Sequence, residues 1–254
     1  MGSKFSLAAW LVVSTIAIGG SMTPQSALAV AISSSNPTTA LEATRIDAAR
    51  HYQQGLTAAA TGNLPQAIES FDRAIELNPE YFQAYLERGN VKDSINDLAG
   101  AIADYTIAIL IEPTNASAYY NRGTVSSKSH LPQAAISDYT RAIAINPEYA
   151  QAYLNRGNER DDLGDVTGAI ADYDRAISIR ANYALAYLNR GITYGRAGNR
   201  AKAIADFRQA ATIFKAKGDL EKYKRAQKMI RDIQSEVWLK SYELWVMSYE
   251  LTRS

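Results

Sequence analysis

The sequence repeats itself every 34 residues over most of its length. The clearest column of this repeat is a glycine, which stands at Gly55, Gly89, Gly123, Gly157 and Gly191. An aromatic residue follows 16 positions after each glycine, and two columns of alanine keep the same period. Because so many columns share one period, the middle of the chain is a series of equivalent structural units. Five units account for residues 48–217, namely 48–81, 82–115, 116–149, 150–183 and 184–217.

Each unit has the pattern of two helices. In the fourth unit, Ala150–Leu163 forms one helical stretch, Gly164 interrupts the chain, and Thr167–Ile179 carries apolar residues at helical spacing. Asn-Pro pairs at 78–79 and 146–147 end second helices, because proline disfavours helical geometry in the residue before it. The small residues of the repeat allow two antiparallel helices to approach closely, and the aromatic residue fills the space beside them.

These columns resemble the tetratricopeptide repeat family, whose units carry an aromatic residue at position 4, glycine at 8, alanine at 20 and 27, an aromatic residue at 24 and proline at 32. The resemblance covers 170 of 254 residues. It implies an all-α fold, a right-handed α-solenoid of five helix-turn-helix units. The chain departs from the family at position 7, which is usually leucine and here is arginine in units two to five.

Position 23 changes together with position 7. The pairs are Arg88 with Asp104, Arg122 with Asp138, Arg156 with Asp172, and Arg190 with Asp206, whereas the first unit has Gln54 and Ser70. Sixteen residues separate the partners, which brings them together if the two helices of a unit fold back on each other. We therefore predict an ion pair within each of these four units, since the arginine fork suits a bidentate carboxylate contact.

Residues 1–29 have the pattern of a secretory signal peptide. A single positive charge precedes an uncharged apolar run at residues 5–20, and Ala27 and Ala29 are the small residues that a signal peptidase reads. The run is shorter than the roughly 20 residues of a membrane-spanning helix, so we predict cleavage and export to the periplasm or the exterior. An uncleaved signal that anchors the chain in a membrane is the alternative. Residues 30–47, rich in Ser, Thr and Ala, are predicted to be a flexible lead-in.

Residues 218–240 are predicted to form a capping helix, because a solenoid needs its last apolar face covered. The apolar stripe of this helix consists of Leu220, Tyr223, Ala226, Ile230, Ile233 and Val237. Residues 241–254 repeat a Ser-Tyr-Glu-Leu motif after seven residues. We interpret this tail as an appended extension without a selected function, and a short interaction peptide is the alternative.

Composition argues against several classes of function. The net charge of +1 gives no electrostatic basis for general nucleic-acid binding, and a chain without cysteine has no disulfide and no cysteine nucleophile. The two histidines, His51 and His130, lack a metal-binding spacing, and no glycine-rich loop could cradle a phosphate. We predict a protein that is not an enzyme, uses no cofactor or metal, binds no nucleic acid, and is not stably inserted in a membrane after signal cleavage.

In the tetratricopeptide repeat family, the first helix of each unit lines a concave groove. Carried over to this chain, the resemblance implies these groove residues: Tyr52, Gln53, Gln83, Leu86, Asn90, Tyr120, Asn121, Thr124, Gln151, Leu154, Asn155, Asn158, Leu188 and Asn189. Amide side chains recur among them, and an amide offers a donor and an acceptor to the backbone of an extended peptide. A solvated surface explains the same amides equally well.

The sequence therefore predicts a scaffold or adaptor of the cell envelope that binds a protein or peptide partner in this groove. A self-associating module with no peptide ligand and a module that binds a polymer such as a glycan are the alternatives. Chaperone-binding members of the family grip a C-terminal carboxylate with a cation at position 5, where this chain has tyrosine or leucine. Nearby Glu87, Asp93, Asp161 and Asp162 would repel a carboxylate, so a neutral or basic segment is expected.

Overall fold

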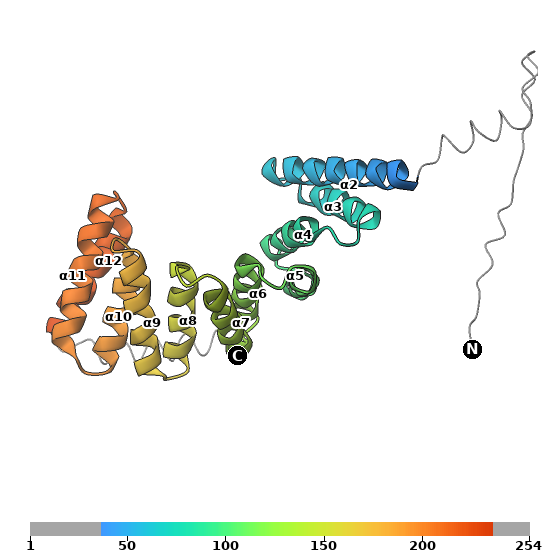
Figure 1. The fold of residues 1–254 in the computed structure, drawn as a ribbon. Coiled ribbons are helices and arrows are strands. Elements are labelled where there is room, and N and C mark those ends of the chain that lie inside the picture. The colour runs from blue at the N-terminus through green and yellow to red at the C-terminus, as the bar shows by residue number, and fades with distance from the viewer. Residues whose placement is uncertain (1–36, 236–254) are drawn as a thin grey trace, which may run out of the picture. The chain divides into compact units, whose positions relative to one another are not determined.

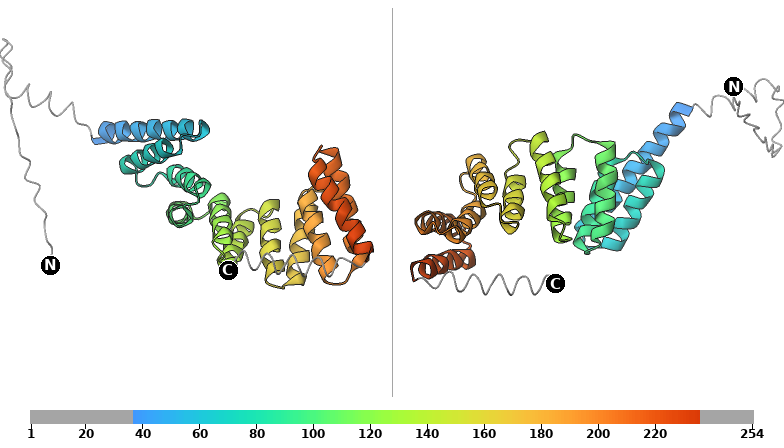
Figure 2. Two further views of the ribbon diagram at one scale, coloured as in Figure 1. Left: turned by 180° about the vertical axis from the view of Figure 1, so that it is seen from behind. Right: turned by 90° about the horizontal axis from the view of Figure 1, so that it is seen from below.

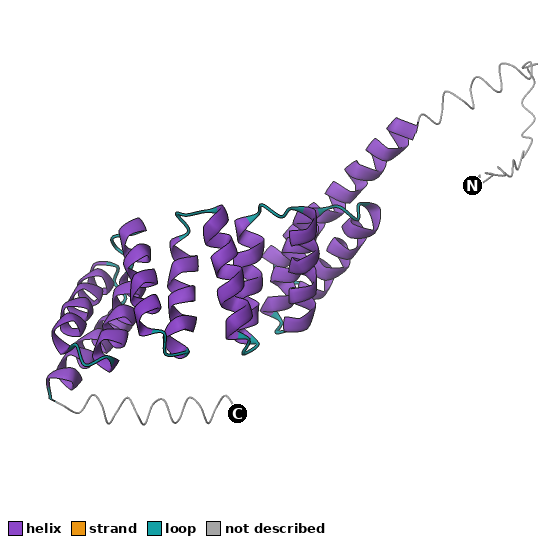
Figure 3. Cartoon of the chain, turned by 60° about the horizontal axis from the view of Figure 1, so that its bottom comes forward, coloured by secondary structure: helices purple, strands orange, loops and turns teal. Residues whose placement is uncertain are grey.

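The computed structural model describes residues 37–235, and every regular element in this range is a helix (Figure 1; Figure 3). The predicted signal peptide and the repetitive tail lie outside the described residues. The helices are α2 (Pro37–Ala60), α3 (Leu64–Leu77), α4 (Phe82–Ser94), α5 (Leu98–Ile111), α6 (Ala116–Lys128), α7 (Pro132–Ile145), α8 (Ala150–Asp162), α9 (Val166–Ile179), α10 (Ala184–Arg196), α11 (Arg200–Ala216) and α12 (Leu220–Gln234).

Consecutive helices pack in pairs, one pair for each 34-residue unit. The first helix packs on the second within a unit, as α4 does on α5, α6 on α7, α8 on α9 and α10 on α11. The second helix of one unit also packs on the first helix of the next, as α5 does on α6, α7 on α8 and α9 on α10. Two further views of the ribbon show the same succession of helix pairs (Figure 2). The predicted all-α solenoid of helix pairs is confirmed.

The repeated glycine and aromatic residue meet at the centre of each pair. A Cβ atom added to Gly157 would lie 2.8 Å from a ring carbon of Tyr173, and that tyrosine is only 1% exposed. The same close contact recurs in the other units: Gly55 with Phe71, Gly89 with Tyr105, Gly123 with Tyr139, and Gly191 with Phe207. The repeated alanines beside them are fully buried, so small residues set the distance between the two helices.

The turn between the two helices of a unit needs a left-handed residue. Glycine fills this position in three units, with φ angles of 78° at Gly62, 82° at Gly164 and 79° at Gly198. The equivalent residues of units two and three are Asn96 (φ 63°) and His130 (φ 58°). Asparagine and histidine are among the residues other than glycine that adopt this conformation most readily. In the sequence, the glycines that recur at this turn in three units indicate the left-handed conformation.

The prediction of a flexible lead-in at residues 30–47 is wrong for the part that the structure describes. Helix α2 begins at Pro37 and runs without interruption into the first unit. Proline is favourable at the first position of a helix, and no glycine or further proline follows it until Gly55. The first helix of unit one is therefore longer than the first helices of the other units.

Helix α12 covers the end of the array as predicted. Ala226, Ile230 and Ile233 are buried in the same core as Phe214 of α11. Leu220, which we assigned to the apolar stripe, is instead 59% exposed. It is the first residue of the helix, directly after the N-cap Asp219, where the helix has not yet reached the core.

Candidate protein-interaction face

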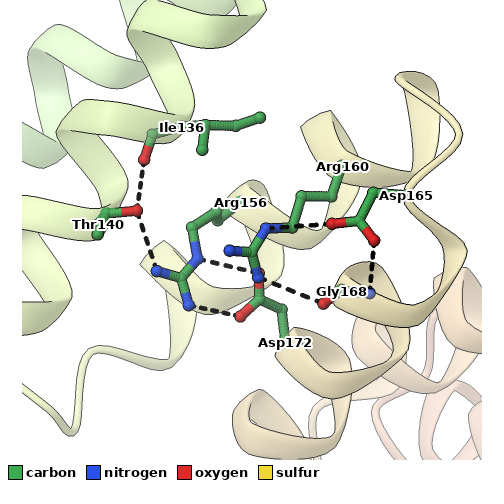
Figure 4. Close-up of polar contacts among 7 residues, drawn as sticks. All are labelled: Ile136, Thr140, Arg156, Arg160, Asp165, Gly168 and Asp172. Carbon is green, nitrogen blue, oxygen red and sulfur yellow. Dashed lines mark hydrogen bonds and ion pairs between the residues drawn. The ribbon is translucent and has the colours of Figure 1, made fainter.

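Each of units two to five holds a bidentate ion pair between its two helices. In unit four, Nε and Nη2 of Arg156 donate to the carboxylate oxygens of Asp172 at 2.9 and 2.6 Å (Figure 4). The Asp172 side chain is 4% exposed and that of Arg156 is 12% exposed. Both bonds lie between 2.6 and 2.9 Å in the equivalent pairs, which are Arg88–Asp104, Arg122–Asp138 and Arg190–Asp206. The four predicted pairs are confirmed, and in each of them the aspartate is buried and the arginine half-buried.

The remaining nitrogen of each arginine fork reaches the preceding unit. Arg156 Nη1 donates to Thr140 Oγ1 at 3.0 Å, and Arg122 Nη1 donates to Thr106 Oγ1 at 3.1 Å. At the other two units the acceptor is a carboxylate: Asp72 for Arg88, and Asp174 for Arg190. One guanidinium therefore links both helices of its own unit to the second helix of the unit before it, which fixes how neighbouring units pack.

The first helices of neighbouring units contact one another, α4 with α6, α6 with α8, and α8 with α10. We call the predicted groove positions on α2, α4, α6, α8 and α10 the first-helix face. Gln53 and Gln83 are exposed on it. The half-buried members are Tyr52, Leu86, Asn90, Tyr120, Asn121, Thr124, Gln151, Asn155, Asn158 and Asn189.

Two of the predicted groove residues are core residues. Leu154 is 5% exposed and shares a hydrophobic core with Tyr173 and Ala186, and Leu188 is 3% exposed in the core that contains Phe207. Both side chains are too buried to contact a ligand in this structure, whereas Leu86, the leucine at the same position of unit two, is half-buried. The family stripe therefore does not predict the exposure of each residue.

Asparagines of neighbouring units bind each other. Asn121 Nδ2 donates to Asn90 Oδ1 at 3.0 Å, and Asn189 Nδ2 donates to Asn158 Oδ1 at 2.8 Å. The same acceptor oxygens also receive the hydroxyls of the buried tyrosines, as Tyr173 Oη donates to Asn158 Oδ1 at 3.0 Å. These amides are neither a free ladder nor a merely solvated surface, since they join units two to three and four to five.

Tyrosine pairs occupy the alternate junctions. The rings of Tyr52 and Tyr81 lie 5.1 Å apart at the junction of units one and two. Those of Tyr120 and Tyr149 lie 4.8 Å apart at the junction of units three and four. Asn155 Nδ2 donates to Tyr120 Oη at 3.1 Å. Along the first-helix face, tyrosine pairs therefore alternate with asparagine pairs.

Two acidic residues of the face are paired with cations. Lys128 Nζ lies 2.7 Å from Asp93, and Arg196 Nη1 lies 2.7 Å from Asp161. Burial raises the pKa of Asp161, and the charge of Arg196 opposes that rise. Asp93 and Asp161 consequently repel a carboxylate ligand less than the sequence suggested. Glu87 forms no ion pair with any residue of the described part of the chain.

The histidines take the positions that the repeat predicts: His51 is half-buried and His130 is exposed. Within residues 37–235, no group of three or more His, Asp or Glu side chains is arranged to hold a metal ion. Among the described helices, none is both long enough and apolar enough to span a lipid bilayer.

Family models for this architecture match units three and five in full and parts of the other three units. A model described as TPR repeat matches residues 55–92 and 157–198, and one described as Tetratricopeptide repeat matches residues 116–149 and 184–217. The chain belongs to the tetratricopeptide repeat family, a class of α-solenoid that serves as a scaffold for protein interactions.

Solved structures of the same fold are similar over most of the array. A MamA protein is 28% identical, with a TM-score of 0.63 over 68% of this chain and 94% of that chain. YrrB, described as a TPR protein with an unusual peptide-binding site, is 25% identical, with a TM-score of 0.62 over 77% of this chain and 99% of that chain. PilW, described as a widely conserved type IV pilus biogenesis factor, shares the fold at 18% identity and a TM-score of 0.58, over 75% of this chain and 98% of that chain. A comparison with curated proteins found no match.

Proposed function

We propose that the protein is a non-enzymatic adaptor that binds an extended segment of a partner protein along its first-helix face. The observation that carries the proposal is the pairing of half-buried tyrosines with amides that keep unused hydrogen-bonding groups. Asn121 and Asn189 each donate one bond to a neighbouring amide, and their Oδ1 atoms accept none from the described residues. A peptide backbone offers the N–H groups that such oxygens can accept. The similarity to YrrB, a TPR protein with a peptide-binding site, supports the same proposal.

Replacing Asn121 and Asn189 together with alanine is expected to weaken binding of the partner segment by roughly 10- to 30-fold, at about 1 kcal/mol for each lost hydrogen bond. The partner is captured from the extracytoplasmic fraction with the wild-type array, and its affinity is then measured by titration. Gln209→Ala, an exposed change on the second helix α11, is the matched control. Unchanged affinity in the double variant would place the ligand elsewhere.

Amidating the C-terminus of the bound segment is expected to leave its affinity unchanged. Position 5 of each unit carries tyrosine or leucine, so the first-helix face has no cation where chaperone-binding members hold a terminal carboxylate. A large loss of affinity on amidation would instead indicate carboxylate recognition.

We also propose that the protein acts outside the cytoplasm, after cleavage that leaves Val30 as its first residue. The uncharged run at residues 5–20 and the small residues before Val30 support export. N-terminal sequencing of the protein from its native host is expected to start at Val30. Recovery from the membrane fraction with an intact Met1 would contradict cleavage.

A further inference from the structure

The two tyrosine pairs of the first-helix face are copies of one arrangement. In each, a tyrosine at position 5 of one unit packs against the tyrosine that ends that unit, at interplanar angles of 39° for Tyr52–Tyr81 and 31° for Tyr120–Tyr149. Each position-5 tyrosine also lies 5.8 Å from the buried aromatic residue of its own unit. The arrangement occurs twice, two units apart, which allows the two copies to be compared directly.

The copies differ at the residue beside the position-5 tyrosine. Next to Tyr120 this residue is Asn155, whose amide reaches the tyrosine hydroxyl. The equivalent residue next to Tyr52, two repeat lengths earlier in the sequence, is Glu87. Burial raises the pKa of Tyr52, and the negative charge of Glu87 raises it further, as expected for a carboxylate close to that hydroxyl.

Among residues 37–235, no cation pairs with the carboxylate of Glu87 or stacks on the rings of Tyr52 and Tyr81. Other tyrosines of the array stack against arginines: Arg88 lies 5.5 Å from the centre of the Tyr85 ring, and Arg180 lies 4.7 Å from that of Tyr183. Within residues 37–235, no arginine or lysine is placed in this way over Tyr52 or Tyr81. The hydrogen-bond partner of Glu87 is neutral, the Nδ2 of Asn90 at 3.0 Å.

We propose that Tyr52, Tyr81 and Glu87 bind a basic side chain of the segment that occupies the first-helix face, and that Tyr120, Tyr149 and Asn155 bind an uncharged one. The inference rests on the proposed function. An arginine or lysine side chain suits the first site because it can stack on the tyrosine rings and pair with the carboxylate. The amide and hydroxyl of the second site offer no charge. The pair of sites thereby selects a segment with one basic and one neutral anchor, and fixes its direction along the array.

A display library of random 12-residue peptides tests this specificity, with the array as the target. Peptides selected by the wild-type array are expected to share one arginine or lysine position, and those selected by Glu87→Gln are expected to lose that preference. Asn155→Glu gives the second site the charge of the first, so its selected peptides are expected to carry two basic positions. Circular dichroism melts show whether each variant is folded.

A second measurement needs only the wild-type array. Replacing the shared arginine of a selected peptide with citrulline keeps its shape but removes its charge, and is expected to weaken binding about tenfold. Selected peptides without a basic preference, or the same preference in Glu87→Gln, would overturn the inference and leave the proposed function standing. Failure to select any peptide would overturn both.

Discussion

Replacing Asp172 with alanine is expected to lower the free energy of unfolding by about 3–5 kcal/mol, because it leaves buried positive charge without a partner. Both bonds from Arg156 end on this carboxylate, and Arg160 Nη1 also contacts it at 2.8 Å. The double variant Arg156→Ala/Asp172→Ala is expected to lose much less than the sum of the two single variants. A double-mutant cycle read by denaturant unfolding measures the difference as a coupling energy.

The exposed pair Arg73–Glu76 is the matched control for that cycle. Its side chains are 55% and 63% exposed, and it is expected to show a coupling energy of at most about 1 kcal/mol. A coupling energy near zero for Arg156 and Asp172 would mean that water solvates each charge separately. The ion pairs would then not stabilise the packing of the helices.

Tyr173→Ala is expected to lower the free energy of unfolding by roughly 3–5 kcal/mol, the range for removing a large buried ring. The tyrosine is 1% exposed, and its ring packs against the backbone at Gly157. The surrounding alanines are too small to fill the cavity. Denaturant unfolding of the variant measures the loss.

Tyr173→Phe separates packing from hydrogen bonding at the same site. This change keeps the ring and removes only the bond from Oη to Asn158 Oδ1, so we expect a loss of about 1 kcal/mol. Asn158 Oδ1 would still accept from Asn189. Equal losses in the alanine and phenylalanine variants would show that the hydroxyl, and not the ring, stabilises the unit.

The repeat period predicted most of the fold because each unit meets nearly the same neighbours. A column of glycine or alanine reports a close helix contact directly, so the helices of unit four were placed to within about one residue. The errors fall where the period ends. Helix α2 extends to Pro37, and Leu220 is exposed, because neither residue has a unit on both sides to define its surroundings.

Pairing within a unit was easier to predict than pairing between units. Arginine at position 7, as in Arg156, occurs in the same units as aspartate at position 23, as in Asp172. The two positions belong to one unit, so their spacing predicts that they lie close together. The hydrogen bond between Asn158 and Asn189 also depends on how one unit is rotated against the next. The length of the repeat gives no information on that rotation. The signal for it was present nonetheless: asparagine at position 9 of one unit coincides with asparagine at position 6 of the next at two junctions.

The exposure of the predicted groove residues could be predicted from the sequence only in part. Position 5 lies at the boundary between the first-helix face and the core. Tyr120 at this position stays half-buried beside another tyrosine, and Leu86 is half-buried as well, whereas Leu188 enters the core. The residue type at position 5 therefore does not by itself predict the exposure of the side chain.

Peptide binding at the first-helix face can be followed through the side-chain amide signals of a ¹⁵N-asparagine-labelled array, titrated with a peptide selected from the display library. If the first-helix face binds the peptide, the signals of Asn121, Asn155 and Asn189 are expected to shift. Those of Asn63 and Asn199, which are exposed N-cap residues of the second helices α3 and α11, are expected to stay in place. Shifts confined to Asn63 and Asn199 would contradict binding at the first-helix face.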